Sequence, residues 1–282
     1  MQTFIADYFL RTNIAEDFSY ADVEVEVKID NSFNNNDITD FTIEASLLTV
    51  ETGLAPNLYT LVITLKDASG NLVDCESCQV GIRKISKAPE QLLVNGRPVV
   101  IRGVNRHEHH PRLGKTNLES CMVKDLVLMK QNNINAVRNR HYPQHQRWYE
   151  LCDLFGMYMI DEANIETHGF FYYPNYKHPA QESCWAASML DRVVGMVERG
   201  KNHACIIIWS IGNEASYGLN HAALSAFLPQ KHLSVKEARN SGFQQHNKLN
   251  NISSSLTHLY KLDYILYSIW PDRSPHPALH GE

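Results

Sequence analysis

Residues that could act as acids, bases or ligands are gathered into clusters that each follow a short apolar run. The clusters are Arg102-Gly103-Val104-Asn105-Arg106-His107-Glu108-His109-His110, Arg138-Asn139-Arg140-His141-Tyr142-Pro143, Asp161-Glu162-Ala163-Asn164-Ile165-Glu166-Thr167-His168-Gly169 and Asn213-Glu214. Imidazole and carboxylate groups can transfer protons, hydrogen-bond hydroxyl groups or bind a divalent cation. A solvated loop could explain any one cluster, but a succession of clusters rich in His and carboxylates predicts a shared site.

The apolar runs before these clusters are expected to be strands of a parallel sheet. The expected strands are 92–101, which ends a hairpin-like segment, then 134–137, 157–160 and 205–209. Apolar residues at helical spacing lie between them, at 118–129, 148–155 and 189–197. Strands that alternate with helices indicate parallel pairing. Since the carboxyl-terminal ends of barrel strands lie on one face, the clusters are expected to converge on one pocket.

Two of the expected helices carry end signals. Thr116 and Glu119 have the spacing of a capping box, which predicts that they cap the start of the first helix. Gly156 follows the apolar stripe of the second helix, where a glycine typically ends a helix in the left-handed conformation.

The first third of the chain has a different pattern, in which apolar and polar residues alternate. The alternation is strict from Val23 to Ile29, and it recurs at 41–47 and 59–65 with turn-forming residues between the runs. Period-two alternation is typical of half-buried strands, and a last strand is expected at 78–85. We therefore predict a small antiparallel sandwich of about five strands, fewer than the seven of a complete immunoglobulin-like fold.

Composition excludes several classes of protein. The chain has 282 residues, of which 44% are hydrophobic and 20% charged, so it can bury a sizeable core. A net charge of -5 leaves no basic surface and argues against nucleic acid as a partner. No run approaches the ~20 apolar residues of a membrane span, and no signal peptide is visible at the N-terminus.

The cysteines predict a reducing, cytoplasmic location. They are Cys75, Cys78, Cys121, Cys152, Cys184 and Cys205. Several fall within apolar patterns, where a cysteine is usually a small buried hydrophobic residue. The Cys75-x-x-Cys78 pair has no second pair at ligand spacing, so we interpret it as structural.

Most common catalytic motifs are missing from the clusters. His107-Glu108-His109-His110 lacks the i, i+4 histidine pair of zinc metalloproteases, and there is no dinucleotide-binding motif, P-loop or serine nucleophile elbow. The remaining candidate is a site built from carboxylates at the strand ends of a barrel. Hydrolysis of a glycosidic bond by a carboxylate pair is the natural candidate chemistry.

The clusters resemble the large β-galactosidases of glycoside hydrolase family 2. The resemblance rests on Arg-Gly-Val-Asn-Arg-His-Glu-His-His-Pro, Ala-Val-Arg-x-x-His-Tyr-Pro, Asp-Glu-Ala-Asn-Ile-Glu-Thr-His-Gly and Trp-Ser-Ile-Gly-Asn-Glu. It implies an α/β fold, a partial TIM barrel of about four βα units, preceded by a small all-β immunoglobulin-like sandwich. The implied domains are a sandwich at 1–88, the first half of the barrel at 89–228 and a divergent, poorly ordered tail at 229–282.

The resemblance also implies an activity, the hydrolysis of terminal β-galactosides with retention. It makes Glu214 the general acid/base and Asn213 the partner of the sugar 2-hydroxyl. It makes His107 and His141 contacts of the galactose hydroxyls. The implied Mg²⁺ ligands are Glu166, His168 and Glu214. Two carboxylates and one imidazole suit a hard divalent ion, and the family implies a possible homo-oligomer.

Some roles near the site stay open, and two positions depart from the family pattern. For His109 and His110, packing is as good an interpretation as substrate contact. Arg140 stands where the family usually has a small residue before His-Tyr-Pro, and Ala215-Ser216-Tyr217-Gly218 replaces a glycine-rich turn.

The end of the chain departs further from the family pattern than these two positions do. The strand–helix alternation and the resemblance are expected to end at about residue 228. The tail contains only Glu237 and Glu282 as glutamates, and neither has the Cys-Glu-Tyr setting of the family nucleophile. We therefore expect a truncated polypeptide. The alternative to an active hydrolase is an inactive fragment that binds sugar or associates with a partner.

Overall fold

The computed structural model describes residues 3–31, 41–49, 56–173, 175 and 177–232. It divides into two compact units, Met1–His168 with Ala187–Ala215 and Gly169–Ala186 with Ser216–Glu282. The tail expected to be poorly ordered, 229–282, lies outside the described residues except for the end of the last helix.

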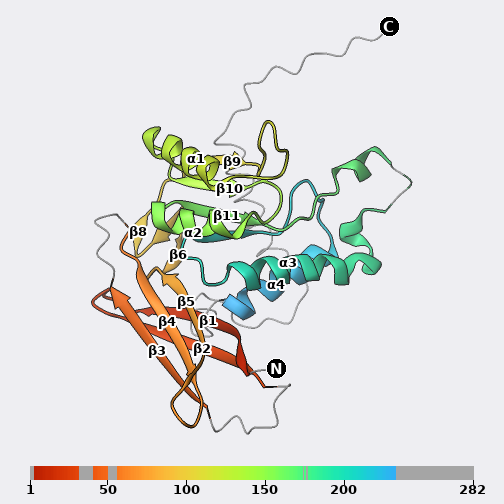
Figure 1. The fold of residues 1–282 in the computed structure, drawn as a ribbon. Coiled ribbons are helices and arrows are strands. Elements are labelled where there is room, and N and C mark those ends of the chain that lie inside the picture. The colour runs from red at the N-terminus through yellow and green to blue at the C-terminus, as the bar shows by residue number, and fades with distance from the viewer. Residues whose placement is uncertain (1–2, 32–40, 50–55, 174, 176, 233–282) are drawn as a thin grey trace. The chain divides into compact units, whose positions relative to one another are not determined.

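The first unit begins with two antiparallel sheets. The first sheet pairs β1 (Phe4–Ile14) with β2 (Ala21–Asp30). The second has the order β3 (Thr42–Thr49), β4 (Tyr59–Lys66) and β5 (Leu72–Val80) (Figure 1). Antiparallel sheets in the first third of the chain were predicted, and this prediction is confirmed.

One core joins these sheets. Leu61, Ile63 and Leu65 alternate along β4 and are buried against Ile5 and Leu10 of β1. The partly buried Val25, Val27 and Ile29 of β2 pack on the same cluster, as strict alternation predicted. Period-two patterning therefore identified the inward face of these strands.

Three details of this region differ from the predictions. β1 was not predicted, because a register shift between Ile5 and Asp7 breaks the alternation along the strand. β3 was expected to be half-buried, but Ile43 is 40% exposed because β3 is an edge strand outside the shared core. The last strand is Leu72–Val80 and not 78–85.

A small antiparallel sheet leads into the parallel part. It consists of β6 (Ile85–Ala88), β7 (Gln91–Val94) and β8 (Arg97–Pro98). The hairpin-like segment is therefore present, but residues 99–101 do not continue it as an apolar strand. Val100 is exposed, and the first parallel strand begins only at Gly103.

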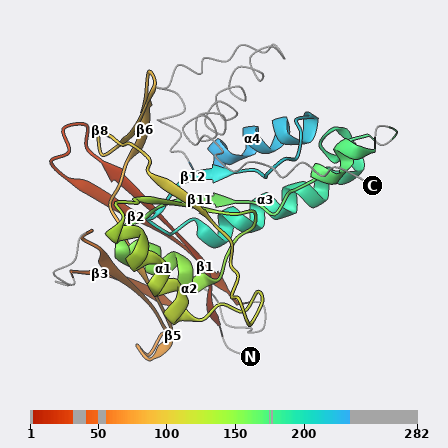
Figure 2. The same cartoon turned by 90° about the horizontal axis from the view of Figure 1, so that it is seen from above.

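The parallel sheet has the order β12-β11-β10-β9. Its strands are β9 (Gly103–Arg106), β10 (Ala136–Asn139), β11 (Tyr158–Glu162) and β12 (Ile206–Ser210), and the helices between them are α1 (Glu119–Gln131), α2 (Gln146–Phe155) and α3 (Ala186–Gly200). α1 and α2 lie side by side (Figure 2). The predicted alternation of helices with parallel strands is confirmed.

The apolar residues of the parallel sheet and its helices form a second core. Met122 and Leu126 of α1 and Trp148 of α2 are buried with Met159 of β11. The guanidinium of Arg106 lies 3.8 Å from the centroid of the Trp148 ring, so the charged end of β9 is held in the core by a cation–π contact. Cys152 and Cys205 belong to the same cluster as free thiols, as predicted for small buried hydrophobic residues.

One helix-end prediction is confirmed and the other is wrong. Gly156 has φ 61° in the left-handed conformation, and a Cβ there would lie 2.6 Å from Cδ of Pro56, so glycine is required. The capping box of Thr116 and Glu119 does not form. α1 begins at Glu119 with Leu118 as its N-cap and no side-chain cap, two residues later than a cap at Thr116 requires. The Glu119 carboxylate pairs instead with Arg147 of α2 at 3.0 Å.

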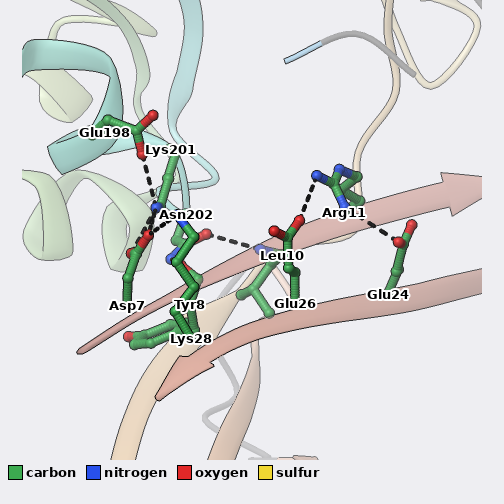
Figure 3. A network of polar contacts seen from close by, with 10 residues as sticks. All are labelled: Asp7, Tyr8, Leu10, Arg11, Glu24, Glu26, Lys28, Glu198, Lys201 and Asn202. Carbon is green, nitrogen blue, oxygen red and sulfur yellow. Dashed lines mark hydrogen bonds and ion pairs between the residues drawn. The ribbon is translucent and has the colours of Figure 1, made fainter. Parts of the chain in front are cut away.

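Polar contacts tie β1 to the turn that precedes β12 (Figure 3). The Asn202 side chain accepts a hydrogen bond from the Leu10 amide and donates one to the Tyr8 carbonyl, both at 3.0 Å. Buried Lys201 pairs with Asp7 at 2.6 Å and with Glu198 at 2.9 Å. The amino-terminal sheet therefore fixes the start of the strand that leads to Asn213 and Glu214.

The second unit holds short 3-10 helices at Pro179–Gln181 and Ser183–Trp185 and the helix α4 (Leu219–His232). A further 3-10 helix, His168–Tyr172, spans the junction of the two units in the sequence. The Asn220 amide donates to the carbonyls of Pro179 and Glu182, both at 2.9 Å, and so fixes α4 to this segment. Among the described residues, no helix has the length and apolarity that a membrane crossing requires.

Candidate active site

The loops that follow β11 and β12 are held together by backbone contacts. The backbone N–H of Asn213 donates a hydrogen bond to the Ile165 carbonyl at 2.9 Å, and Glu166 and Asn213 form an isolated parallel β-bridge. Gly212 has φ 140°, and a Cβ there would lie 2.5 Å from the Ile165 oxygen. Only glycine permits this approach, so Gly212 places the Asn-Glu pair beside the neighbouring loop.

Glu214 occupies a strained backbone position with an accessible side chain. Its φ is 44°, in the left-handed region that non-glycine residues seldom adopt. The side chain is 42% exposed, and Oε2 is in contact with Nδ1 of His168. Strained backbone held by its surroundings is typical of functional residues. Glu214 is thus an accessible carboxylate beside an imidazole.

A fully buried carboxylate organises the strand ends around it. The side chain of Glu162, at the end of β11, is 0% exposed. Its Oε2 accepts hydrogen bonds from Nε of Arg138 and Oγ of Ser210, both at 2.7 Å, and its Oε1 accepts from Nδ1 of His141 at 2.7 Å. Burial alone would raise the pKa of Glu162, but the His141 and Ser210 hydrogen bonds and the Arg138 charge bring that pKa below its usual value.

Arg138 also hydrogen-bonds Asn213 and so links it to the Glu162 network. Its guanidinium donates to Oδ1 of Asn213 at 3.0 Å, and Nδ2 of Asn213 donates to Oε1 of Glu166 at 3.2 Å. The two contacts fix which way the buried Asn213 amide points. The predicted site residues Asn213, Glu166 and His141 are therefore linked through Arg138 and Glu162.

The two histidines predicted to contact sugar lie near each other. The ring centroids of His107 and His141 are 5.6 Å apart in an edge-to-face arrangement. His107 is exposed as a whole, but the partial loss of water around its ring, together with the charges of Arg140 and His141, lowers its pKa below the usual value. Nε of Arg140 donates to Nε2 of His141 at 2.7 Å.

Other residues of the first cluster have structural roles. Nδ1 of His110 accepts hydrogen bonds from the amides of Arg112 and Leu113, both at 3.1 Å, so His110 stabilises a turn. The Glu108 carboxylate accepts from the His145 amide at 3.1 Å, beside the start of α2. For His110 the packing interpretation is thus the better supported one.

The three residues predicted to bind a metal lie on the two joined loops. Glu166 contacts Asn213, while His168 and Glu214 contact each other. Within the described residues, no group of three His, Cys, Asp or Glu side chains could hold a metal ion as placed. The donor types and the position of the loops nonetheless fit a hard divalent cation.

Sequence reasoning did not assign Glu162, Arg138 and Ser210, which hold the site together. Arg138 was named only as the first residue of the second polar cluster, directly after the apolar pair Ala136-Val137. Glu162 lies in the cluster 161–169, in which only Glu166 and His168 were assigned a role. Charged residues within or next to an apolar strand are the signal that could have identified both, since a buried charge requires a partner.

A second buried carboxyl lies beside Glu162. Oδ1 of Asp161 accepts hydrogen bonds from Nδ2 of Asn139 at 2.7 Å and from the Tyr149 hydroxyl at 2.9 Å. Oδ2 has no hydrogen-bond partner among the described residues. Burial raises the pKa of Asp161 to about 6, although these hydrogen bonds oppose the shift.

Replacement of Asp161 by Asn is expected to raise the free energy of unfolding above pH ~7, because Oδ1 keeps its hydrogen bonds and the buried charge, which costs on the order of 3 kcal/mol, is removed. The amide group that replaces the unpartnered Oδ2 has no acceptor among the described residues and is expected to offset part of this gain. The carboxyl binds its proton more tightly in the folded chain, so wild-type stability falls as the pH rises from about 4 to about 6. Urea unfolding at several pH values measures both effects. The same fall in stability in Asp161→Asn would contradict the prediction.

The chain matches a known protein family over more than half of its length. Residues 84–267 match the family described as Glycosyl hydrolases family 2, TIM barrel domain. The match extends past residue 228, where we expected the resemblance to end, so that expectation is wrong. The matched residues from 233 onward lie outside the part of the chain that the structure describes.

Individual relatives agree with the family match. A beta-galactosidase of Vibrio cholerae is 48% identical over 196 residues, which cover 70% of this chain and 19% of that protein. A beta-galactosidase of Pseudoalteromonas haloplanktis is 52% identical over 173 residues, 61% of this chain and 16% of that protein. The chain therefore spans only about a sixth to a fifth of the length of these relatives.

The fold is similar to that of a solved structure. A β-glucuronidase from Ruminococcus gnavus aligns with a TM-score of 0.70 at 23% sequence identity, covering 82% of this chain and 42% of that one. At this identity the likeness concerns the fold alone. It agrees with the predicted α/β barrel region preceded by antiparallel sheets.

Proposed function

Because this chain belongs to glycosyl hydrolase family 2, we propose that it binds terminal β-galactosides and hydrolyses them with retention of configuration. The curated relatives with about half of their aligned residues identical are beta-galactosidases, which supports this substrate. One structural observation carries the proposal. Glu214 is an accessible carboxylate at the end of a parallel strand, held beside the buried amide of Asn213.

Glu214 is the proposed general acid/base. Its carboxyl group would protonate the glycosidic oxygen as the bond to the anomeric carbon breaks, and its carboxylate would then accept a proton from the attacking water. The exposed side chain permits access of a substrate. The left-handed backbone of Glu214 and the close contact at Gly212 support a fixed direction of approach for this group.

Asn213 and His107 are the proposed sugar contacts. His141 was also expected to contact the sugar, but its two ring nitrogens are hydrogen-bonded to Glu162 and Arg140, so we assign it a positioning role instead. Asn213 would hydrogen-bond the 2-hydroxyl, an interaction that strengthens as the transition state forms. Its amide is already oriented by Arg138 and Glu166, so little conformational entropy is lost on binding.

Glu166, His168 and Glu214 are the proposed ligands of a Mg²⁺ ion. When bound, the ion would supply a fixed positive charge that stabilises the carboxylate form of Glu214. Within the protein, His168 already contacts that carboxylate. The cytoplasmic location and the possible homo-oligomer remain predictions.

A second candidate function is sugar binding without hydrolysis. Retention requires a second carboxyl group about 5–5.5 Å from the acid/base to act as nucleophile. Two carboxylates at and after the end of β11 already have protein partners. Glu162 pairs with Arg138 and His141, and Glu166 accepts a hydrogen bond from Asn213. This observation favours binding of the sugar over turnover by the described part of the chain.

An assay of the purified chain on a nitrophenyl β-galactoside separates the two functions. Hydrolysis is expected to fall after removal of metal with EDTA and to return with added Mg²⁺, since the ion contributes to the charge at Glu214. Absence of turnover together with a melting temperature raised by galactose would favour the binding function. Absence of both turnover and any effect of galactose would refute both candidates.

A further inference from the structure

Both ring nitrogens of His141 are engaged by other protein groups. Nδ1 lies 2.7 Å from the ionised carboxylate of Glu162, and Nε2 lies 2.7 Å from Nε of Arg140. Nε of a guanidinium always carries a proton and can only donate, so Nε2 of His141 must be the acceptor. Nδ1 of His141 therefore donates to Glu162 while Nε2 accepts from Arg140, and the ring has no donor left for a sugar hydroxyl.

Arg140 takes the accessible position instead. Its side chain is exposed, while His141 is largely covered. Its Nε contacts His141, which leaves the two terminal nitrogens of the guanidinium for a ligand. In the described ranges, no carboxylate forms an ion pair with Arg140, whereas the charge of Arg138 is matched by Glu162.

The described residues around Arg140 do not neutralise its charge. His107 lies next to His141, and the Arg140 charge contributes to the lowered pKa of that ring. Glu166 also acts on His107, but its carboxylate accepts from Asn213 and is a proposed metal ligand. Beside His107 and His141, the fixed positive charge of Arg140 therefore lacks a balancing group among the residues that the structure describes.

We propose that Arg140 selects β-galactosides that carry an anionic substituent, a carboxylate or a sulfate group. This inference rests on the proposed function and names its substrate class. A guanidinium presents a planar pair of donors that match the two oxygens of a carboxylate or sulfate, and such charge-assisted hydrogen bonds exceed those to a neutral hydroxyl. Arg140 is therefore a specificity-determining residue, and His141 acts by holding its guanidinium in place.

Calorimetric titration of the purified chain tests this proposal with three methyl β-glycosides: the galactoside, the galacturonide and the galactoside 6-sulfate. The wild type is expected to bind an acidic glycoside about tenfold more tightly than the neutral one at low salt. Added salt is expected to reduce that ratio, because exposed charges are screened. Comparison of the two acidic ligands distinguishes a carboxylate from a sulfate site.

Three variants separate Arg140 from a general charge effect. Arg140→Ser is expected to bring the affinity ratio to about one, and Arg140→Lys to retain a preference, because it keeps the charge and loses only the planar pair of donors. Arg192→Ser removes an exposed guanidinium on α3 and is expected to leave the ratio unchanged.

Several outcomes would overturn the proposal. Equal affinity of the wild type for neutral and acidic glycosides would refute the role of Arg140 while leaving the proposed function standing. A preference that survives Arg140→Ser, or that is lost in Arg192→Ser, would do the same. Failure of the wild type to bind any of the three glycosides would refute the proposed sugar site and this inference with it.

Discussion

Replacement of Glu214 by Gln is expected to lower kcat for a nitrophenyl β-galactoside by about 10²- to 10⁴-fold, the usual contribution of a general acid/base. Glutamine has nearly the same shape but can neither give nor take the proton. The His168 ring loses its charged partner in this variant, yet the Asn213 contacts to Arg138 and Glu166 do not involve Glu214. Binding of galactose is therefore expected to change much less than kcat.

Glu150→Gln is the matched control for this experiment. Glu150 lies on α2 with a side chain that is 43% exposed, close to the 42% of Glu214, and it forms one ion pair, with Arg147. An equal loss of activity in both variants would indicate a general effect of charge. Unchanged turnover in Glu214→Gln would exclude it as the acid/base.

Replacement of Glu162 by Gln is expected to lower the free energy of unfolding by about 3–5 kcal/mol, because it leaves Arg138 in a largely buried position without a counter-charge. The side chain of Arg138 is nearly covered, and Glu162 is fully covered. The His141 contact to Glu162 would also lose its charged acceptor. Urea unfolding of the two proteins at neutral pH measures this difference.

A double-mutant cycle separates the ion pair from other effects of the substitution. The double variant Glu162→Gln/Arg138→Met is expected to lose less free energy of unfolding than the sum of the losses of the two single variants. The pKa of Glu162 is lower in the folded chain, so its stabilisation is present above the unfolded pKa and lost as the pH falls through the folded pKa. Additive effects in the cycle would contradict a coupled pair.

How far the sequence predicted the fold depended on how regular each pattern was. The period-two run of β2 and the helical spacing in α2 identified elements that the structure contains. Prediction failed where local irregularity or tertiary position decided, as with the shifted register in β1 and the exposed edge strand β3. The capping box failed because α1 begins two residues later than the spacing implied, and Glu119 then pairs with Arg147 on another helix.

The candidate site shows the same division. The polar clusters after successive strands were evident in the sequence, and so was Arg140 as an unusual charge. The sequence could not reveal that Glu162 binds Arg138, His141 and Ser210 at once, because these partners are 21 to 48 residues away along the chain. Their meeting depends on the order and register of parallel strands.

The sequence by itself determined the succession of antiparallel strands and then strand–helix units, because the period of apolar residues records which face of each element is buried. It also determined the family, through motifs long enough to be specific. Only the tertiary structure decided which polar groups meet. It oriented Asn213 between Arg138 and Glu166, and it placed His141 between Glu162 and Arg140. The physical reason is that a hydrogen bond acts over about 3 Å, and only packing of distant segments brings donor and acceptor that close.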